Sequence, residues 1–205
     1  MKYIELSRLI QDGLPGYPGD TVTELKPHKT LQRDHYNNHQ LNINMHAGTH
    51  IDGPMHLTDR RVYLSEYSPD KFIGEGCLLN VRGEREIGYQ PAYEERIKEH
   101  GIVLLHTGHG KRYGHSDYFT DYPVLTLGLA ELFVRKNVKL VGLDTPSPDK
   151  FPFEVHKYLF EHDILLIENL TNLDGMEGAG SFEVIAMPLY IQADSSIARV
   201  VARVK

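Results

Sequence analysis

The sequence predicts a single α/β domain, spanning residues 1–205, with a mixed β-sheet. A chain of 205 residues suits one domain with a sizeable core, and no internal repeat, low-complexity tract or linker divides it. Strand and helix patterns alternate in the second half, which predicts parallel strands joined by crossover helices. Strand patterns without helices precede and follow that region. The sheet is therefore expected to be mixed rather than purely parallel.

The N-terminal quarter is expected to contain short strands around a loop. Residues 11–20 are rich in glycine and proline, which favours a loop. Alternating apolar and polar residues predict strands at Lys2–Ser7, Thr21–Leu25 and His39–His46. In the last of these, the alternation would turn Leu41, Ile43 and Met45 toward the core and the polar face toward a cleft.

The remainder reads as two crossover units followed by closing strands. The expected helices are Pro91–His100, Leu127–Lys136 and Phe153–His162. The expected strands are Gly76–Val81, Ile102–Thr107, Val138–Asp144, Ile164–Glu168, Phe182–Ile191 and Ile197–Val204.

Composition excludes several classes of protein. The formal net charge of −6 gives no electrostatic case for binding nucleic acid. No apolar run approaches the ~20 residues of a membrane helix, and the N-terminus lacks the core of a signal peptide. The one cysteine, Cys77, excludes an intrachain disulfide and fits a reducing compartment. We therefore expect a cytoplasmic protein that contacts neither membrane nor nucleic acid.

The stretch Met45–His56, M-H-A-G-T-H-I-D-G-P-M-H, carries the strongest chemical signal. His46, His50, Asp52 and His56 offer the imidazole and carboxylate donors that zinc prefers. In a straight strand His46 and His50 would lie roughly 13 Å apart, too far for one ion. The chain must therefore bend near Gly48 and run extended from His50 to Asp52. The alternative is a loop of surface histidines, which the spacing H-x3-H-x-D-x3-H argues against.

Further ligands must come from elsewhere in the chain. Glu168 ends an apolar strand, the place where open α/β sheets present functional groups, and His156 lies on the preceding helix. From the residues alone, Glu168 could equally be a strand-end charge and His156 a half-buried helix histidine.

The motif H-x-G-T-H-x-D-x-P-x-H from His46 to His56 resembles the signature of the cyclase-like metal-dependent hydrolases, the family of bacterial kynurenine formamidase and isatin hydrolase. The resemblance runs from Tyr17 to Arg199 and implies a swivelling β/β/α fold and a homo-oligomer, dimeric or tetrameric. It also implies that His156 and Glu168, twelve residues apart, complete the metal site, and that His56 is a proton shuttle.

These observations predict a metal-dependent hydrolase that cleaves a small aryl or cyclic amide or formamide by a metal-bound hydroxide. Five ligands suit two divalent ions, Zn²⁺ first and Mn²⁺ as the alternative, if carboxylates bridge. His56 is left over after the ligands are counted, and its titration range suits proton transfer. A further ligand or a neighbour of the ligands is the competing interpretation of His56. The other function classes are a non-catalytic metal-binding or regulatory protein and a mononuclear hydrolase or isomerase.

Two other features bear on the substrate and on a second site. The resemblance places Tyr17 where kynurenine formamidases carry a substrate-stacking tryptophan, and this chain contains no tryptophan. Tyrosine keeps an aromatic face for an aryl substrate. A second histidine group, His106, His109 and His115, could bind metal or line a pocket, but we expect His109 and His115 to lie in a surface loop.

Overall fold

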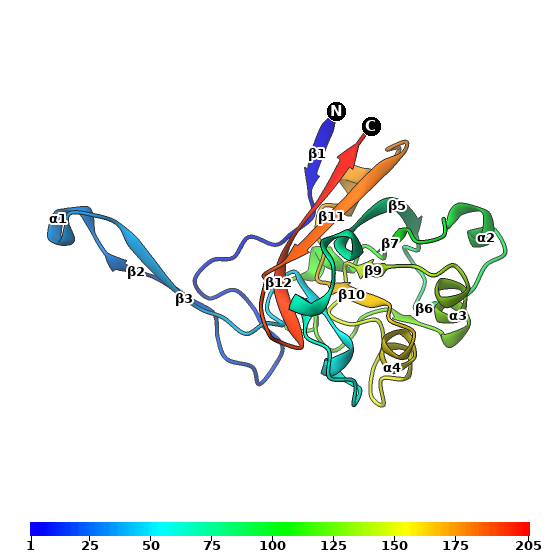
Figure 1. The fold of residues 1–205 in the computed structure, drawn as a ribbon, viewed down its shortest axis with the longest axis horizontal. Helices are drawn as coiled ribbons and strands as arrows, with labels where there is room; N and C mark the ends of the chain where they lie inside the picture. The colour runs from blue at the N-terminus through cyan, green and yellow to red at the C-terminus, as the bar shows by residue number, and fades with distance from the viewer.

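The chain folds around an eight-stranded mixed sheet that closes on itself (Figure 1). The computed structural model describes residues 1–205. The sheet order is β1-β12-β11-β5-β7-β9-β10-β4, and β12 also pairs with β4. Seven strands therefore form a closed ring, and β1 extends it alongside β12. The strands are β1 Lys2–Glu5, β4 His50–Asp52, β5 Ile73–Asn80, β7 Ile102–His106, β9 Leu140–Leu143, β10 Leu165–Glu168, β11 Phe182–Pro188 and β12 Ser195–Val204.

The predicted crossover units are present. Strands β5, β7, β9 and β10 are parallel neighbours, and the remaining pairings in the sheet are antiparallel. Helices α3 (Leu127–Arg135) and α4 (Glu154–Glu161) connect them and pack against each other. The single α/β domain with a mixed sheet is confirmed.

Two buried clusters lie on opposite faces of the sheet, because successive side chains in a strand alternate. One cluster joins Val103, Leu105 and Val141 to α3 and α4. The other lies inside the ring and includes Ile51, Leu104 and Ile167 among its 17 residues. Since Ile51 points into the ring, His50 and Asp52 point to the face covered by the helices.

Residues 24–42, which we call the arm, project away from the body (Figure 1). The arm contains β2 (Glu24–Lys29), the single-turn helix α1 (Leu31–Asp34) and β3 (Asn38–Asn42), and none of its residues is buried. The prediction that His39–His46 forms a core-facing strand is wrong, since β3 ends at Asn42 and Leu41 is 42% exposed. Its alternation reflects a two-stranded hairpin with no core beneath it.

Other element bounds also differ from expectation. The predicted helix Pro91–His100 is reduced to α2 (Tyr93–Arg96), because the backbone is extended at Ile97. The predicted strand Thr21–Leu25 is displaced to β2, β11 ends three residues before Ile191, and β12 begins two residues before Ile197. Short strands β6 (Glu86–Ile87) and β8 (Val124–Leu125) pair at the periphery and were not predicted.

None of the helices combines the length and the apolar character that crossing a bilayer requires. The longest is α3, with nine residues.

Candidate metal centre

The His50–Asp52 segment is held between two strands that fix its side chains. Strand β4 runs antiparallel to both β10 and β12, and its register sets Glu168 opposite His50 and Ser195 opposite Asp52. His50 and Asp52 are two residues apart on an extended strand, so they share one face. Both are almost completely buried. The side chains of His50, Asp52 and Glu168 therefore meet where β10 ends.

The chain bends before this strand, as predicted from the spacing of the histidines. Gly48 has φ of +63°, a left-handed conformation that glycine adopts at little cost, and a Cβ there would meet Leu14 at 3.0 Å. The Gly48 carbonyl accepts a hydrogen bond from His50 Nδ1 at 2.9 Å. The bend brings the rings of His46 and His50 to a centroid separation of 5.2 Å.

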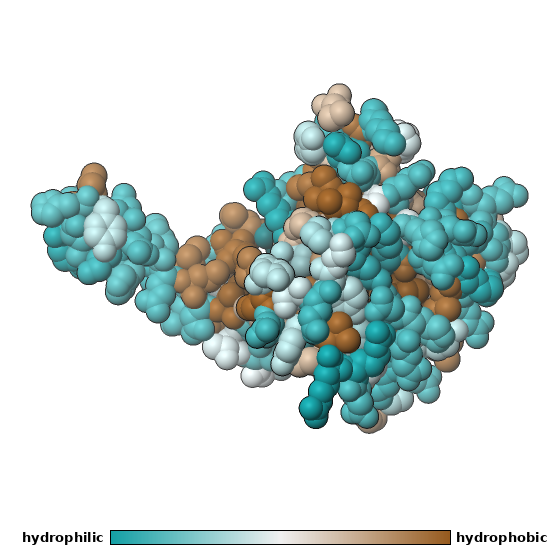
Figure 2. Space-filling model, in the orientation of Figure 1, coloured by the Kyte–Doolittle hydropathy of each residue, from teal (hydrophilic) through white to brown (hydrophobic).

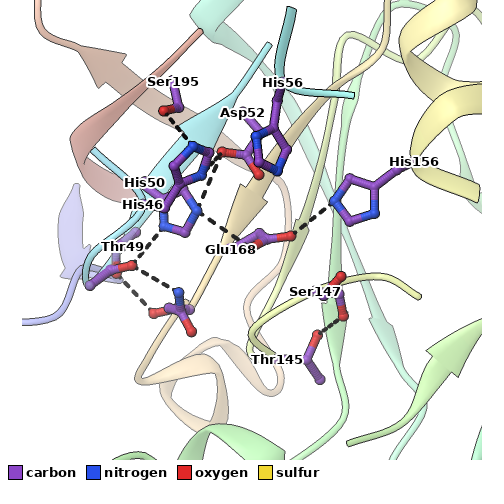
Figure 3. A network of polar contacts seen from close by, with 12 residues as sticks. His46, Thr49, His50, Asp52, His56, Thr145, Ser147, His156, Glu168 and Ser195 are labelled. Atoms are coloured by element: carbon purple, nitrogen blue, oxygen red, sulfur yellow. Dashed lines mark hydrogen bonds and ion pairs between the residues drawn. The ribbon is translucent and has the colours of Figure 1, made fainter. Parts of the chain in front are cut away.

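His156 approaches from the opposite side, on α4 (Figure 3). Its Nε2 lies 3.3 Å from Glu168 Oε1, while the other oxygen of Glu168 lies 3.4 Å from His50 Nε2. His46 Nδ1 and His50 Nε2 lie 2.9 and 3.3 Å from Asp52 Oδ1. All five residues predicted as metal ligands are thus brought together.

Each histidine in this group is oriented by a hydrogen bond at its outer nitrogen. His46 Nε2 contacts Asp194 Oδ2 at 3.0 Å and the Ser195 hydroxyl at 2.9 Å. His156 Nδ1 contacts Asp149 Oδ1 at 2.5 Å. With His50 bound to Gly48, every ring keeps its other nitrogen directed at Asp52 or Glu168. Such outer partners fix the ring and the tautomer of metal-binding histidines.

Several donor atoms of this group lie close together without hydrogen-bonding one another. His50 Nε2, Asp52 Oδ1 and Glu168 Oε1 are buried and lack a hydrogen bond of acceptable geometry, despite their short separations. A buried polar atom without a partner costs about 1–3 kcal/mol. His50, Asp52 and Glu168 form one group spaced to hold a metal ion, and His46, Asp52 and His56 form another. The residues present therefore fit a divalent cation.

Neighbouring carboxylates favour the protonated histidines in the absence of metal. Burial opposes charge on His46, but hydrogen bonds to Asp194 and Asp52 outweigh it and raise the pKa of His46 to about 9. For His156, burial is likewise outweighed by Asp149 and Glu168, which raise its pKa to about 9. The hydrogen bonds from His46 and His56 hold the pKa of Asp194 well below its usual range.

His56 lies at the edge of this group and remains accessible. It ends the short 3-10 helix Pro54–His56, its side chain is 32% exposed, and its Nδ1 lies 3.5 Å from Asp194 Oδ2. Its ring centroid is 4.3 Å from that of His46 and 6.3 Å from that of His156. Its position fits both the proton-shuttle prediction and the competing interpretation as a ligand.

A cavity of about 300 Å³ opens above these donors. Tyr17 lines it and is 50% exposed. Its ring meets that of Phe119 edge to face, with the ring centroids 5.7 Å apart. Tyr122 and Phe153 add to an aromatic wall, and the metal-ligand candidates form the polar floor. This lining suits a partly apolar molecule with a polar reacting group.

Sequence reasoning missed the carboxylates that support the histidines. Asp149 and Asp194 lie within the stretch from Tyr17 to Arg199 over which the chain resembles the cyclase-like hydrolases, and this was the only signal for them. No sequence pattern indicated that Phe119 and Tyr122 would line the cavity. The surface-loop prediction is wrong for His109, which is buried. Its Nε2 donates a hydrogen bond to the Tyr118 carbonyl, and its ring stacks on the Tyr118 ring. His115 is exposed as predicted.

The comparisons with known proteins agree with this geometry. Residues 4–150, more than half of the chain, match the model of the family described as putative cyclase. The chain belongs to this family. It is 27% identical to kynurenine formamidase of Bacillus cytotoxicus over 208 residues, covering 98% of this chain and 97% of that protein. Kynurenine formamidase of Bacillus anthracis is 29% identical over 209 residues, with the same coverage.

Solved structures share the fold. Isatin hydrolase A from Labrenzia aggregata superposes with a TM-score of 0.86 at 22% identity, covering 99% of this chain and 93% of that one. A potential metal-dependent hydrolase with cyclase activity gives 0.80 at 20% identity, covering 100% and 98%. The cyclase-like fold expected from the His46–His56 motif is therefore confirmed.

Proposed function

We propose that the protein is a metal-dependent hydrolase that cleaves a small aryl or cyclic amide or formamide. The observation that carries this proposal is the convergence of five buried or half-buried donors on the floor of an aromatic-walled cavity. The names of the relatives, kynurenine formamidase and isatin hydrolase, support hydrolysis of a non-peptide C–N bond.

His46, His50, Asp52, His156 and Glu168 would hold two divalent ions. The two oxygens of Glu168 face different histidines, which supports a bridging role for this carboxylate. Asp52 faces both His46 and His50, so it could bridge as well. Three imidazoles and two carboxylates favour Zn²⁺, with Mn²⁺ as the alternative. The ions would supply Lewis-acid polarisation of the substrate carbonyl and a lowered pKa for the attacking water.

His56 would move the proton between the attacking water and the leaving nitrogen. Among the three histidines of the motif it is the most exposed, with 32% of its side chain accessible against 23% for His46 and 2% for His50. Asp194 contacts both His46 and His56, so it would orient the shuttle relative to the reacting atoms. A positioned acid-base group of this kind contributes about 10²–10⁴-fold in rate.

The aromatic wall would select the substrate. Tyr17 and Phe119 are in edge contact, and Tyr122 lines the same cavity, so a flat ring could lie against them while its amide reaches the floor. Deeper in the site, the Asn169 side-chain amide donates to the Gly48 carbonyl and holds the bend that positions His46.

Metal counting combined with a substrate panel tests this proposal. Purified protein should contain close to two ions per chain and hydrolyse formanilides or aryl-fused cyclic imides and lactams only when loaded. One ion per chain, with an unchanged count in His156→Ala, would indicate a mononuclear hydrolase or isomerase. Stoichiometric metal without turnover of any panel member would indicate a non-catalytic metal-binding protein.

We also propose that the chain forms a homo-oligomer, a dimer or a tetramer, through its arm. An isolated two-stranded hairpin is marginally stable in water, and the arm has no core of its own. The arm carries a net charge of +1, which leaves −7 on the rest of the chain, so arm and body are complementary. Brown apolar surface gathers where the arm meets the body (Figure 2), and Leu9, Met187 and Leu189 line a groove with exposed side chains.

Light scattering of the full chain, and of a variant in which residues 24–42 are replaced by a short glycine-serine linker, tests this association. The intact chain should be oligomeric and the variant monomeric. A monomeric intact chain, or an oligomer that survives the replacement, would show that the arm does not form the interface.

The single cysteine and the absence of any disulfide support a cytoplasmic location, which fractionation of the source cells would test.

A further inference from the structure

We propose a second divalent-cation site, separate from the candidate metal centre, formed by His106, Asp174 and Glu177. His106 is the last residue of β7, and the two carboxylates lie on or just after the short 3-10 helix Leu173–Met176. One donor atom from each residue lies within 4.8 Å of the other two.

The observation that points to a ligand is the state of His106. The residue is 1% exposed, and its Nδ1 is buried without a hydrogen-bond partner. Its Nε2 lies 3.5 Å from Asp174 Oδ1, and its Nδ1 lies 3.6 Å from Glu177 Oε1. These separations are too long for hydrogen bonds. The two ring nitrogens face different carboxylates, so an ion would take one ring nitrogen together with one oxygen from each carboxylate, a set whose atoms lie within 4.8 Å of one another. An unpaired buried imidazole nitrogen is costly unless something binds it.

There is space for an ion beside His106 and Asp174. A cavity of about 210 Å³ is lined by His106, Asp174 and Asn172, outside the carboxyl ends of the parallel strands. It shares no lining residue with the cavity above the candidate metal centre. The site is therefore a second one and not an extension of the first.

Two cations already contact the carboxylates and would have to be displaced. Lys111 Nζ lies 3.1 Å from Asp174, and an Arg82 nitrogen lies 2.7 Å from Glu177. All four side chains are between 42% and 67% exposed, and exposed pairs of this kind contribute little to stability. A divalent ion bound also by an imidazole nitrogen would replace them, and both cationic side chains can move into solvent.

The donor set defines the class of ligand. One imidazole and two carboxylates suit Zn²⁺ or Mn²⁺ better than Ca²⁺, which prefers oxygen ligands only. A bound ion would join β7 to the segment that follows β10, where Asp174 and Glu177 lie six and nine residues after Glu168. We expect it to stabilise that segment and not to take part in the reaction.

Metal counting by mass spectrometry after equilibrium dialysis against Zn²⁺, on the full chain with its main centre loaded, tests the site. The double variant Asp174→Asn/Glu177→Gln should bind one ion fewer per chain than the unchanged protein, and its activity should be unaffected. These two side chains are exposed, so the variant is expected to fold. His115→Ala removes an exposed histidine from the neighbouring loop and serves as the matched control, with an unchanged count.

A second measurement separates this site from the main one. Adding Zn²⁺ to protein that is loaded at its main centre only should raise the Tm of the unchanged chain and of His115→Ala, but not that of the double variant. Equal ion counts and equal Tm shifts in all three proteins would overturn the proposal, as would loss of an ion in His115→Ala. Neither result would alter the proposed hydrolase activity, which is measured separately.

Discussion

The arm and the candidate metal centre are separated by only three residues of sequence, yet their environments are opposite. The arm ends at Asn42 with every side chain at least partly exposed, whereas His50 and Asp52 are enclosed between β10 and β12. In the arm, structure rests on one hairpin. At the centre, side chains from β4, β10 and α4, which are far apart in the sequence, lie within about 3.5 Å of one another. Single substitutions should therefore have small effects in the arm and large ones at the centre.

The largest effect is expected from His50→Ala. The ring is fixed by the Gly48 carbonyl and faces both Asp52 and Glu168, so its loss removes a donor that no neighbour can replace. Bound metal and activity should disappear together, with activity at background. His39→Ala makes the same chemical change on the exposed arm and should retain full metal content. A metal-replete His50→Ala protein would show that the centre is wrongly assigned.

His56→Ala should leave the metals bound but reduce kcat about 10²–10⁴-fold. The leaving nitrogen would depart without a proton, so a substrate with a good leaving group should lose less than an ordinary amide. Parallel measurement of metal content and of kcat for both substrates checks this. Loss of an ion would instead make His56 a ligand, in keeping with its grouping with His46 and Asp52.

Metal affinity should depend steeply on pH. In the metal-free chain the pKa values of His46 and His156 are raised to about 9, so both rings are protonated at pH 7 and must lose their protons to bind an ion. The affinity for an ion that displaces one of these protons should therefore fall roughly 10-fold per pH unit below pH 9, and the combined affinity for both ions roughly 100-fold. Calorimetry in buffers of different ionisation enthalpy would count the protons released, and a count near zero at pH 7 would contradict the prediction.

Asp194→Asn should weaken metal binding or activity about 10–100-fold, the usual cost of removing a partner of a ligating histidine. The carboxylate accepts from His46 and lies beside His56, so the neutral amide would orient both rings less firmly. Titration with Zn²⁺ measures the loss in metal affinity, and steady-state kinetics measure the loss in activity. Asp12→Asn, which changes an exposed carboxylate in the N-terminal loop, is the matched control and should behave as the unchanged chain.

The same contrast explains what the sequence could and could not predict. The metal-binding motif was recognisable because four donors fall within eleven residues and their spacing requires a bend, which Gly48 provides. Asp149 and Asp194 became recognisable as partners only once α4 and β12 were placed beside the motif. In the arm, alternation of apolar and polar residues correctly indicated an extended chain. It could not indicate whether a core lay beneath Leu41, because burial depends on the other elements and not on the pattern itself.

The smallest effect is expected from Tyr17→Ala. Tyr17 is half exposed and contacts Phe119, so its loss removes one face of the aromatic wall but no donor from the floor. KM for aryl substrates should rise several-fold, in keeping with about 0.5–1.5 kcal/mol for an aromatic contact, while kcat and the metal count stay unchanged. Aliphatic formamides should be affected less because they have no ring to lie against that wall. Tyr17→Phe keeps the ring and should retain the original KM, which separates stacking from any role of the hydroxyl. An equal rise in KM for aryl and aliphatic substrates would place the substrate elsewhere in the cavity.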